Sequence, residues 1–205
     1  MNNAGVMALP LGTTKEGFET QLGTNHVGPA LLTRLLMPTL LSTAKEPGAD
    51  VRIINLASEA HVFARSADIL LDESKLNAQT TWVRYGYSKL ANILYTQELA
   101  VRYPGIKSVA IHPGVIKTDL WIQNKHTNVV MDYIMAAGLF LIGQSVEMGA
   151  RNQLWAATCK KEEIVSGRYY KPIGILSKGN LLVGNSELAK GLWEWTEKEL
   201  EERDY

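Results

Sequence analysis

Tyr85 and Lys89 are the residues whose types and spacing point most directly to chemistry. They stand four positions apart, so on a helix they would lie side by side on one face. A phenol has an ordinary pKa of about 10 and transfers protons poorly at neutral pH, but a nearby ammonium group favours the phenolate and lowers that pKa. The pair therefore predicts a proton-transfer site in which Lys89 tunes Tyr85.

Such a pair also occurs on ordinary solvated helix faces, so the elements around it decide its meaning. Residues 51–57 and 107–112 are short apolar runs followed by small or turn residues, as in buried parallel strands. Between them, apolar residues recur at helical spacing from 85 to about 102. This alternation predicts an α/β architecture with a mostly parallel sheet.

Ser58 directly follows the first predicted strand. In parallel α/β sheets, ligand-binding groups lie beyond the carboxyl ends of the strands. The helix that carries Tyr85 and Lys89 precedes the next strand, so a strand-end hydroxyl and a helix-borne pair are expected to converge on one crevice.

The same periodicity predicts two further helices and a last strand. One helix is expected over 24–41, with a kink or a late start at Pro29. The last strand is expected over 167–173, and Ser186 is expected to cap a final helix. The inner side of the helix over 24–41 is expected to carry Leu31, Leu32, Leu35 and Leu36.

Composition favours one ordinary globular domain over residues 1–205, because 46% of the residues are hydrophobic and 20% are charged. Basic and acidic residues balance at 21 each, which argues against a nucleic-acid partner. The most apolar stretch, 133–143, is much shorter than the roughly 20 residues that a membrane span needs. A soluble, cytoplasmic protein is therefore expected.

Cysteine and histidine usage argues against a metal site. Cys159 is the single cysteine, so the chain can form no internal disulfide and no multi-thiolate site, and we expect this side chain to belong to the core. The four histidines show no ligand-like spacing. No metal is therefore expected.

Five short motifs stand in a recognisable order along the chain. They are Asn2-Asn-Ala-Gly5, Asn25 in Thr-Asn-His-Val-Gly, Asn55-Leu-Ala-Ser58, Tyr85-Gly-Tyr-Ser-Lys89 and Pro113-Gly-Val-Ile-Lys-Thr118. In order and approximate spacing they resemble the short-chain dehydrogenase/reductase family. The segments 58–61 and 85–92 look most like the subgroup of retinol dehydrogenases and WW-domain oxidoreductases, including many fungal members. The resemblance implies a Rossmann-like, doubly wound parallel sheet.

The resemblance also implies a catalytic role for each matched residue. Tyr85 would exchange a proton with the substrate oxygen, and Ser58 would hold that oxygen. Lys89 would lower the pKa of the tyrosine and bind the nicotinamide ribose, while Asn25 would support a proton-relay water. Tyr87 is excluded from the catalytic role because no lysine follows it at four positions.

The cofactor implied by the resemblance is NADP or NAD, with NADP slightly favoured. Asn2, Ala4 and Gly5 would lie at the backbone beside the adenine ribose. Ile116 and Thr118 would contact the amide and phosphate side of the nicotinamide.

The implied substrate is a small hydrophobic alcohol or ketone, because residues 119–143 match the variable substrate loop of the family and are rich in apolar side chains. Packing of those side chains on the core is an equally open interpretation. Family members often pair through helices equivalent to 24–41 and 85–102, which makes a homo-oligomer an option.

The chain departs from the family pattern at its front. Family members begin with a strand and a T-G-x-x-x-G-x-G turn, which binds the dinucleotide phosphates at a helix N-terminus, and no such pattern occurs here. An N-terminally truncated fold is therefore expected. Its origin would be an incomplete gene model, which we favour, a natural truncation with another activity, or a fragment that pairs with a separate front half.

The predicted function is hydride transfer between NAD(P)(H) and a hydrophobic alcohol or carbonyl compound, and the truncation raises the prospect that the chain alone is inactive. Two alternatives stay open. A degenerate family member without cofactor could act as a binding protein through an exposed sheet edge. An isomerase or dehydratase could use the same tyrosine and lysine for acid/base chemistry without redox.

Overall fold

The computed structural model describes residues 1–116 and 145–203 of the protein. Four strands form one sheet and stand in chain order: β1 (Arg52–Leu56), β2 (Lys107–Ile111), β3 (Tyr169–Lys171) and β4 (Ile175–Ser177). β1 pairs with β2 and β2 with β3 in parallel, whereas β4 returns antiparallel to β3. The predicted parallel strands and the Rossmann-like class are confirmed.

The first residues of the chain continue this sheet on the side of β1 away from β2. The backbone N–H of Asn2 donates to the carbonyl of Ile54 at 2.8 Å, and the N–H of Leu56 donates to the carbonyl of Asn2 at 3.1 Å. The side-chain amide of Asn2 also donates to Asn55 Oδ1 at 2.7 Å. The segment before Gly5 is therefore held to the sheet at its start.

Ten helical segments are present in the described residues. The long ones are α2 (Gly28–Thr43), α5 (Thr81–Arg102), α7 (Val146–Thr158) and α8 (Ser186–Glu201). The short ones are α1 (Thr20–Leu22), the π-helical turn η1 (Gly23–Val27), η2 (Glu59–Phe63), α3 (Ala67–Leu70), α4 (Glu73–Asn77) and η4 (Leu181–Gly184). None of the helices in the described residues combines the length and the apolar character needed to cross a membrane.

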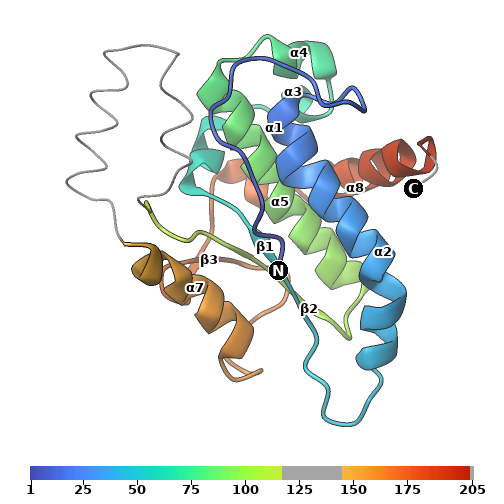
Figure 1. Ribbon diagram of the computed structural model, residues 1–205, viewed down its shortest axis with the longest axis vertical. Helices are drawn as coiled ribbons and strands as arrows, with labels where there is room; N and C mark the ends of the chain where they lie inside the picture. The colour runs from blue at the N-terminus through green and yellow to red at the C-terminus, as the bar shows by residue number, and fades with distance from the viewer. Residues whose placement is uncertain (117–144, 204–205) are drawn as a thin grey trace.

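Helices cover both faces of the sheet, as in a doubly wound fold. Alternate residues of a strand point to opposite faces. Ile54 and Val109 pack with Ala156 of α7, whereas Ile53 and Ala110 belong to the clusters formed with the helices of the other face. In Figure 1, α7 lies on one side of the strands, and α2 and α5 lie on the other.

The starts of two predicted helices differ from expectation, and one strand was not predicted. α5 begins at Thr81, four residues before Tyr85. The prediction missed this first turn because its polar and aromatic residues do not continue the apolar period. Asn185, rather than Ser186, caps α8, since its side chain accepts the N–H of Leu188 at 2.9 Å. The short edge strand β4 was not predicted, and two exposed apolar residues in it give no alternation to detect.

α2 buries a different face from the predicted one. The helical run starts at Thr20, before the predicted residue 24, and passes through the π-helical turn η1 into α2. The α-helix α2 itself begins only at Gly28, with Pro29 in its first turn. The buried residues of α2 are Ala30, Thr33 and Met37. Leu31 is partly buried, but the expectation was wrong for the other three leucines, since Leu32, Leu35 and Leu36 are 47–62% exposed.

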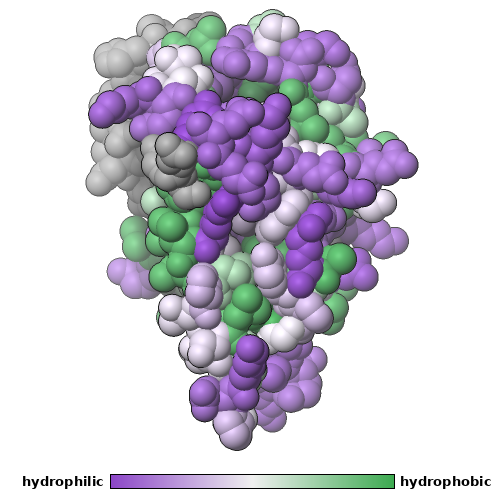
Figure 2. Space-filling view, turned by 90° about the vertical axis from the view of Figure 1, so that its right-hand side faces the viewer, coloured by the Kyte–Doolittle hydropathy of each residue, from purple (hydrophilic) through white to green (hydrophobic). Residues whose placement is uncertain are grey.

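Apolar residues lie all round α2, so their period alone could not choose the inner face. Because some of these apolar residues stay exposed, part of the molecular surface formed by α2 is apolar. Figure 2, which looks at the side of the molecule that carries α2, shows separate apolar patches among polar surface.

α5 is the central element of the core. Leu90, Ile93 and Leu94 are at most 1% exposed and pack with residues of α8 and of the sheet. Further along α5, Tyr95 stacks on Trp193 of α8 with ring centroids 5.1 Å apart. The helix that carries the predicted catalytic pair is thus fixed along its length.

Leu90→Ala should lower the free energy of unfolding by about 2–5 kcal/mol, because the truncation leaves a cavity beside fully buried neighbours. Leu181→Ala is the matched control, since that side chain is 98% exposed and the same change should cost less than about 0.5 kcal/mol. Urea unfolding followed by circular dichroism measures both. Equal losses in the two variants would contradict the central place of α5.

Candidate active site

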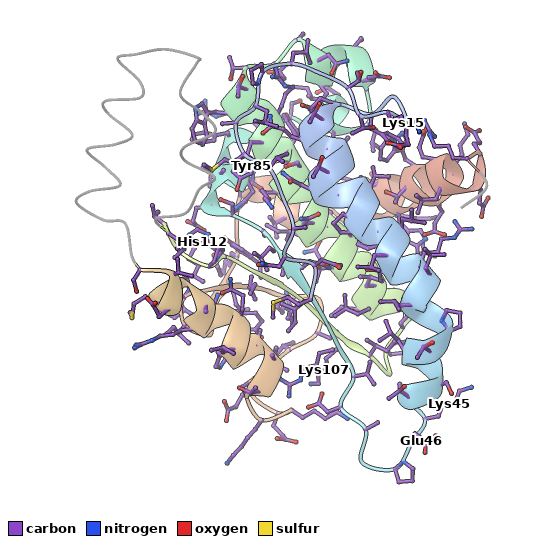
Figure 3. All side chains as sticks on the ribbon, in the orientation of Figure 1. Lys15, Lys45, Glu46, Tyr85, Lys107 and His112 are labelled. Carbon is purple, nitrogen blue, oxygen red and sulfur yellow. The ribbon has the colours of Figure 1, made fainter. Side chains whose placement is uncertain are left out.

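A cavity of about 590 Å³ opens beyond the carboxyl ends of β1 and β2, where sheets of this kind bind ligands. Four of its polar lining residues are Ser58, Glu59, Tyr85 and His112, and apolar side chains make up most of the remaining wall. Figure 3 shows Tyr85 and His112 toward the same side of the molecule, with Lys107 at the opposite end of β2. The predicted crevice therefore exists, and Ser58 and Tyr85 both line it.

Tyr85 lies in the second turn of α5 and is 8% exposed. Met7 and Ala8 pack on it together with Trp82, whose ring meets the phenol edge-on at 6.2 Å between centroids. Burial raises the pKa of Tyr85 to about 12, and the nearby Ser58 hydroxyl acts in the opposite direction with smaller effect. Tyr85 is thus held as a neutral phenol at neutral pH.

Ser58 stands at the junction of β1 and η2. Its Oγ accepts the N–H of Ala60 at 3.2 Å and so caps the 3-10 turn. That bond uses a lone pair of the hydroxyl and leaves its hydrogen able to donate. Ser58 can therefore donate to an oxygen placed between it and Tyr85.

Lys89 is buried beneath Tyr85, with its Nζ 5.6 Å from the centroid of the phenol ring. The Nζ donates to the carbonyl of Leu56 at 3.2 Å, and Asn92 donates to the same oxygen at 2.8 Å. Burial lowers the pKa of Lys89 to about 8. Burial and the Ser58 hydroxyl account for the shifted pKa of Tyr85 without a contribution from Lys89, so the lowering of that pKa by Lys89 stays a prediction.

Asn25 lies in the π-helical turn η1 and is 1% exposed. Its Oδ1 accepts the N–H of Val6 at 2.7 Å, and its Nδ2 donates to the carbonyl of Val6 at 2.8 Å and to Ser88 Oγ at 2.9 Å. Ser88 Oγ in turn donates to the carbonyl of Tyr85 at 2.8 Å. Asn25 therefore fastens the start of the chain to α5, and its predicted support of a relay water stays a prediction.

The predicted cofactor residues near the start of the chain fall in different surroundings. A Cβ at Gly5 would lie 2.9 Å from Asn25 Oδ1 and 3.5 Å from Lys89 Nζ, so only glycine lets the chain approach the site this closely. Ala4 is exposed, and the side chain of Asn2 is engaged with Asn55 and Thr33 rather than with the cavity.

The segment after β2 supplies another wall of the cavity. It runs from His112 through Pro113 and Gly114 to Ile116, and Gly114 adopts a φ of +99° that favours glycine. Ile116 lines the cavity, and its contact with nicotinamide stays a prediction. Thr118 and the predicted substrate loop, residues 119–143, which contains His126, lie outside the described residues.

Several cavity residues escaped the sequence analysis. On α7, Val146, Gly149, Ala150 and Gln153 line the cavity at spacings of three and four, a helical signal that was available in the sequence. His112 also lines it, and burial lowers the pKa of this imidazole to about 4, which keeps it neutral.

No pattern in the sequence predicted that Met7 and Trp82 line the cavity, because their positions depend on contacts between distant segments.

The described residues hold no group of three or more histidine, cysteine or acidic side chains that could bind a metal ion.

Tyr87 occupies a different environment from Tyr85. It is 1% exposed, and its hydroxyl donates to the carbonyl of Ser66 at 2.9 Å. It therefore anchors the segment before α3, and only Tyr85 of the two lines the cavity.

A doubly wound parallel sheet, with Ser58 just beyond a strand end and Tyr85 and Lys89 on α5, defines a Rossmann-type domain with a candidate proton-transfer site. No family model matches the chain. Among curated proteins it is 31% identical over 217 residues to the short-chain dehydrogenase/reductase drtF of Aspergillus calidoustus, covering 100% of this chain and 68% of the relative. It is 37% identical over 204 residues to retinol dehydrogenase 13 of Homo sapiens, covering 94% and 57%.

A solved structure of an uncharacterised protein from Mycobacterium paratuberculosis is also similar, with a TM-score of 0.68 at 29% identity over 98% of this chain and 65% of that one. The chain belongs to the short-chain dehydrogenase/reductase family, and its relatives include the retinol dehydrogenase and fungal members that the motifs indicated. It spans 57–68% of the length of the curated relatives it matches.

Gly5→Ala should lower the free energy of unfolding by about 1–3 kcal/mol, because the added Cβ would push on an Asn25 amide that hydrogen bonds hold on both sides. Gly105→Ala is the control, since nothing lies within 4 Å of a Cβ there. Thermal unfolding compares the two. A Gly5→Ala variant as stable as the control would show that the chain does not approach Asn25 this closely.

Proposed function

We propose that this chain belongs to an NAD(P)(H)-dependent oxidoreductase that interconverts a hydrophobic alcohol and its carbonyl compound. The observation that carries the proposal is the placement of Ser58 and Tyr85 on one apolar cavity, with Lys89 buried beneath the phenol. Two hydroxyls at one point of an apolar wall suit a substrate with one oxygen to be held and otherwise apolar surface.

In the reducing direction, the carbonyl oxygen accepts a hydrogen bond from Ser58 and a proton from Tyr85. A phenol whose pKa is raised to about 12 is protonated at neutral pH and is ready to serve as the acid. In the oxidising direction Tyr85 has to accept the proton of the alcohol, which requires a lower pKa. The ammonium group of Lys89, 5.6 Å from the centre of the phenol ring, is the nearby positive charge that can supply this lowering.

The residues present fit the nicotinamide end of the cofactor. Gly5 gives the backbone its close approach to Lys89, and Ile116 lines the cavity. A volume of about 590 Å³ accommodates a nicotinamide ring with a small substrate rather than a whole dinucleotide. When bound, the nicotinamide would supply or accept the hydride, while the residues of this chain hold the substrate oxygen and move its proton.

The apolar wall supports a hydrophobic substrate. Met7, Phe63 and Trp82 line the cavity, and the neutral His112 adds no charge to it. The choice of NADP over NAD, a cytoplasmic location and a homo-oligomer are parts of the same proposal that rest on composition and family resemblance. The exposed leucines of α2 offer apolar surface for such an assembly.

Tyr85→Phe should reduce turnover at least about 100-fold while cofactor binding is retained, because the variant loses only the proton that the reaction needs. Tyr87→Phe is the matched control, since it makes the same change two residues along α5, away from the cavity, and should stay within about twofold. NADPH and NADH binding is followed by nicotinamide fluorescence, and turnover is followed with a panel of alcohols and ketones.

The chain is assayed beside a longer form that carries the glycine-rich front of its relatives. Retained turnover in Tyr85→Phe would remove Tyr85 from the mechanism. Product formed with NAD(P) excluded would instead indicate acid/base chemistry without redox.

A further inference from the structure

Arg84, the residue before Tyr85, forms an ion pair with Glu19 that is almost completely removed from water. Arg84 Nε lies 3.3 Å from Glu19 Oε1, and the two side chains are 4% and 1% exposed. Burying two charges costs solvation energy that their attraction only partly returns, so apolar residues often stabilise such a position equally well. The reason for a buried ion pair at this position is therefore to be sought in the segments that it holds together.

Arg84 contacts three stretches of the chain, two of which lie far from it in sequence. Besides Glu19, it donates through Nη2 to the carbonyl of Leu9 at 3.2 Å and through Nη1 to the carbonyl of Gln79. The carbonyl of Leu9 belongs to the strap, residues 6–12, which Figure 1 shows running along α5 before the chain turns back into α1. One guanidinium thus ties the strap and the approach to α5 to the start of α1.

Glu19 is fixed at its other oxygen. Oε2 accepts the N–H groups of Gln21 and Leu22 at 3.0 and 2.8 Å, which caps α1. Because the carboxylate is held by the helix start, it presents Oε1 to Arg84 in one orientation. Glu19 Oε1 and Arg84 Nε form no hydrogen bond with each other, so the pair is a buried charge–charge contact whose position is set by the hydrogen bonds that each side chain makes elsewhere.

The strap is fastened on both sides of the residues that cover Tyr85. Asn25 holds Val6 through two hydrogen bonds, and Arg84 holds Leu9. Between these points, Met7 and Ala8 pack on the phenol. Ala8 has a φ of +52°, a left-handed conformation that alanine keeps only where its surroundings enforce it.

We propose that Glu19 and Arg84 are positioning residues for Tyr85. Their ion pair holds the strap against the phenol, and the strap in turn keeps the phenol facing the cavity beside Ser58. This inference rests on the proposed role of Tyr85 in proton transfer. Neither residue lines the cavity. They act through the strap and through the first turn of α5.

The test uses the 205-residue chain labelled with 3-fluorotyrosine and observed by fluorine NMR. Tyr85→Phe and Tyr87→Phe identify the two resonances by their loss. The variants are Glu19→Gln, which keeps an oxygen to cap α1, Arg84→Met, which keeps side-chain length without donors, and their combination. Thermal unfolding of each variant is measured in parallel.

Each single variant leaves one buried charge unpaired and is expected to lower the melting temperature. The double variant buries no charge and should recover most of that loss. Its Tyr85 resonance should nevertheless stay displaced or broadened, because Leu9 no longer has its donor, while the Tyr87 resonance stays at its wild-type position. Stability and positioning are thereby separated in one protein.

A double variant with Tyr85 at its wild-type position would overturn the proposal, as would Tyr85 and Tyr87 resonances that move together. In the form that turns over substrate, the double variant should lower kcat at least 10-fold with the Kd for NADPH unchanged, and an unchanged kcat would equally overturn it. If Tyr85→Phe leaves turnover intact while the resonance of Tyr85 moves as expected, the link stands and the proposed function fails.

Discussion

The burial of an amine and a phenol on one helix is the constraint on which the rest of the structure depends. Lys89 can stay inside only because β1 ends at Leu56, whose carbonyl turns to accept its Nζ. The same carbonyl takes the amide of Asn92, so α5 is docked against the end of β1 by polar bonds as well as by its leucines. The cavity follows from this docking, because Ser58 comes two residues after Leu56 and must lie beside the phenol.

The parts of the fold that the sequence predicted are those in which one physical requirement decides the pattern. β1 and β2 are buried on both faces and read as short apolar runs, and α5 repeats its apolar residues until the chain turns. The buried face of α2 was predicted wrongly because apolar residues surround this helix. Packing against α5 and α8 decides which face is buried, and that face includes Thr33 and excludes Leu35. β4 carries no alternation at all, since an edge strand of three residues has little burial to record.

The candidate site shows the same division. Ser58, Tyr85 and Lys89 were predictable because strand ends and helix spacing bring them together. The strap and the face of α7 were not, because they join the cavity through contacts between segments far apart in the chain. Nor could residue spacing predict that the pKa of Tyr85 is raised. The shift depends on how strongly burial opposes the effect of the nearby amine, and only the folded chain creates that burial.

The contacts that fix Tyr85 come from the strap, Asn25, Ser58 and α5, all of which belong to the first 116 residues that the structure describes. The motif that binds dinucleotide phosphates in the family is not among the 205 residues. The position of the Tyr85 phenol is therefore set by contacts within residues 1–116 and does not depend on the motif that binds dinucleotide phosphates. A chain that binds nicotinamide cofactor weakly can still hold its tyrosine in place, so absence of turnover alone would say nothing about the geometry of this site.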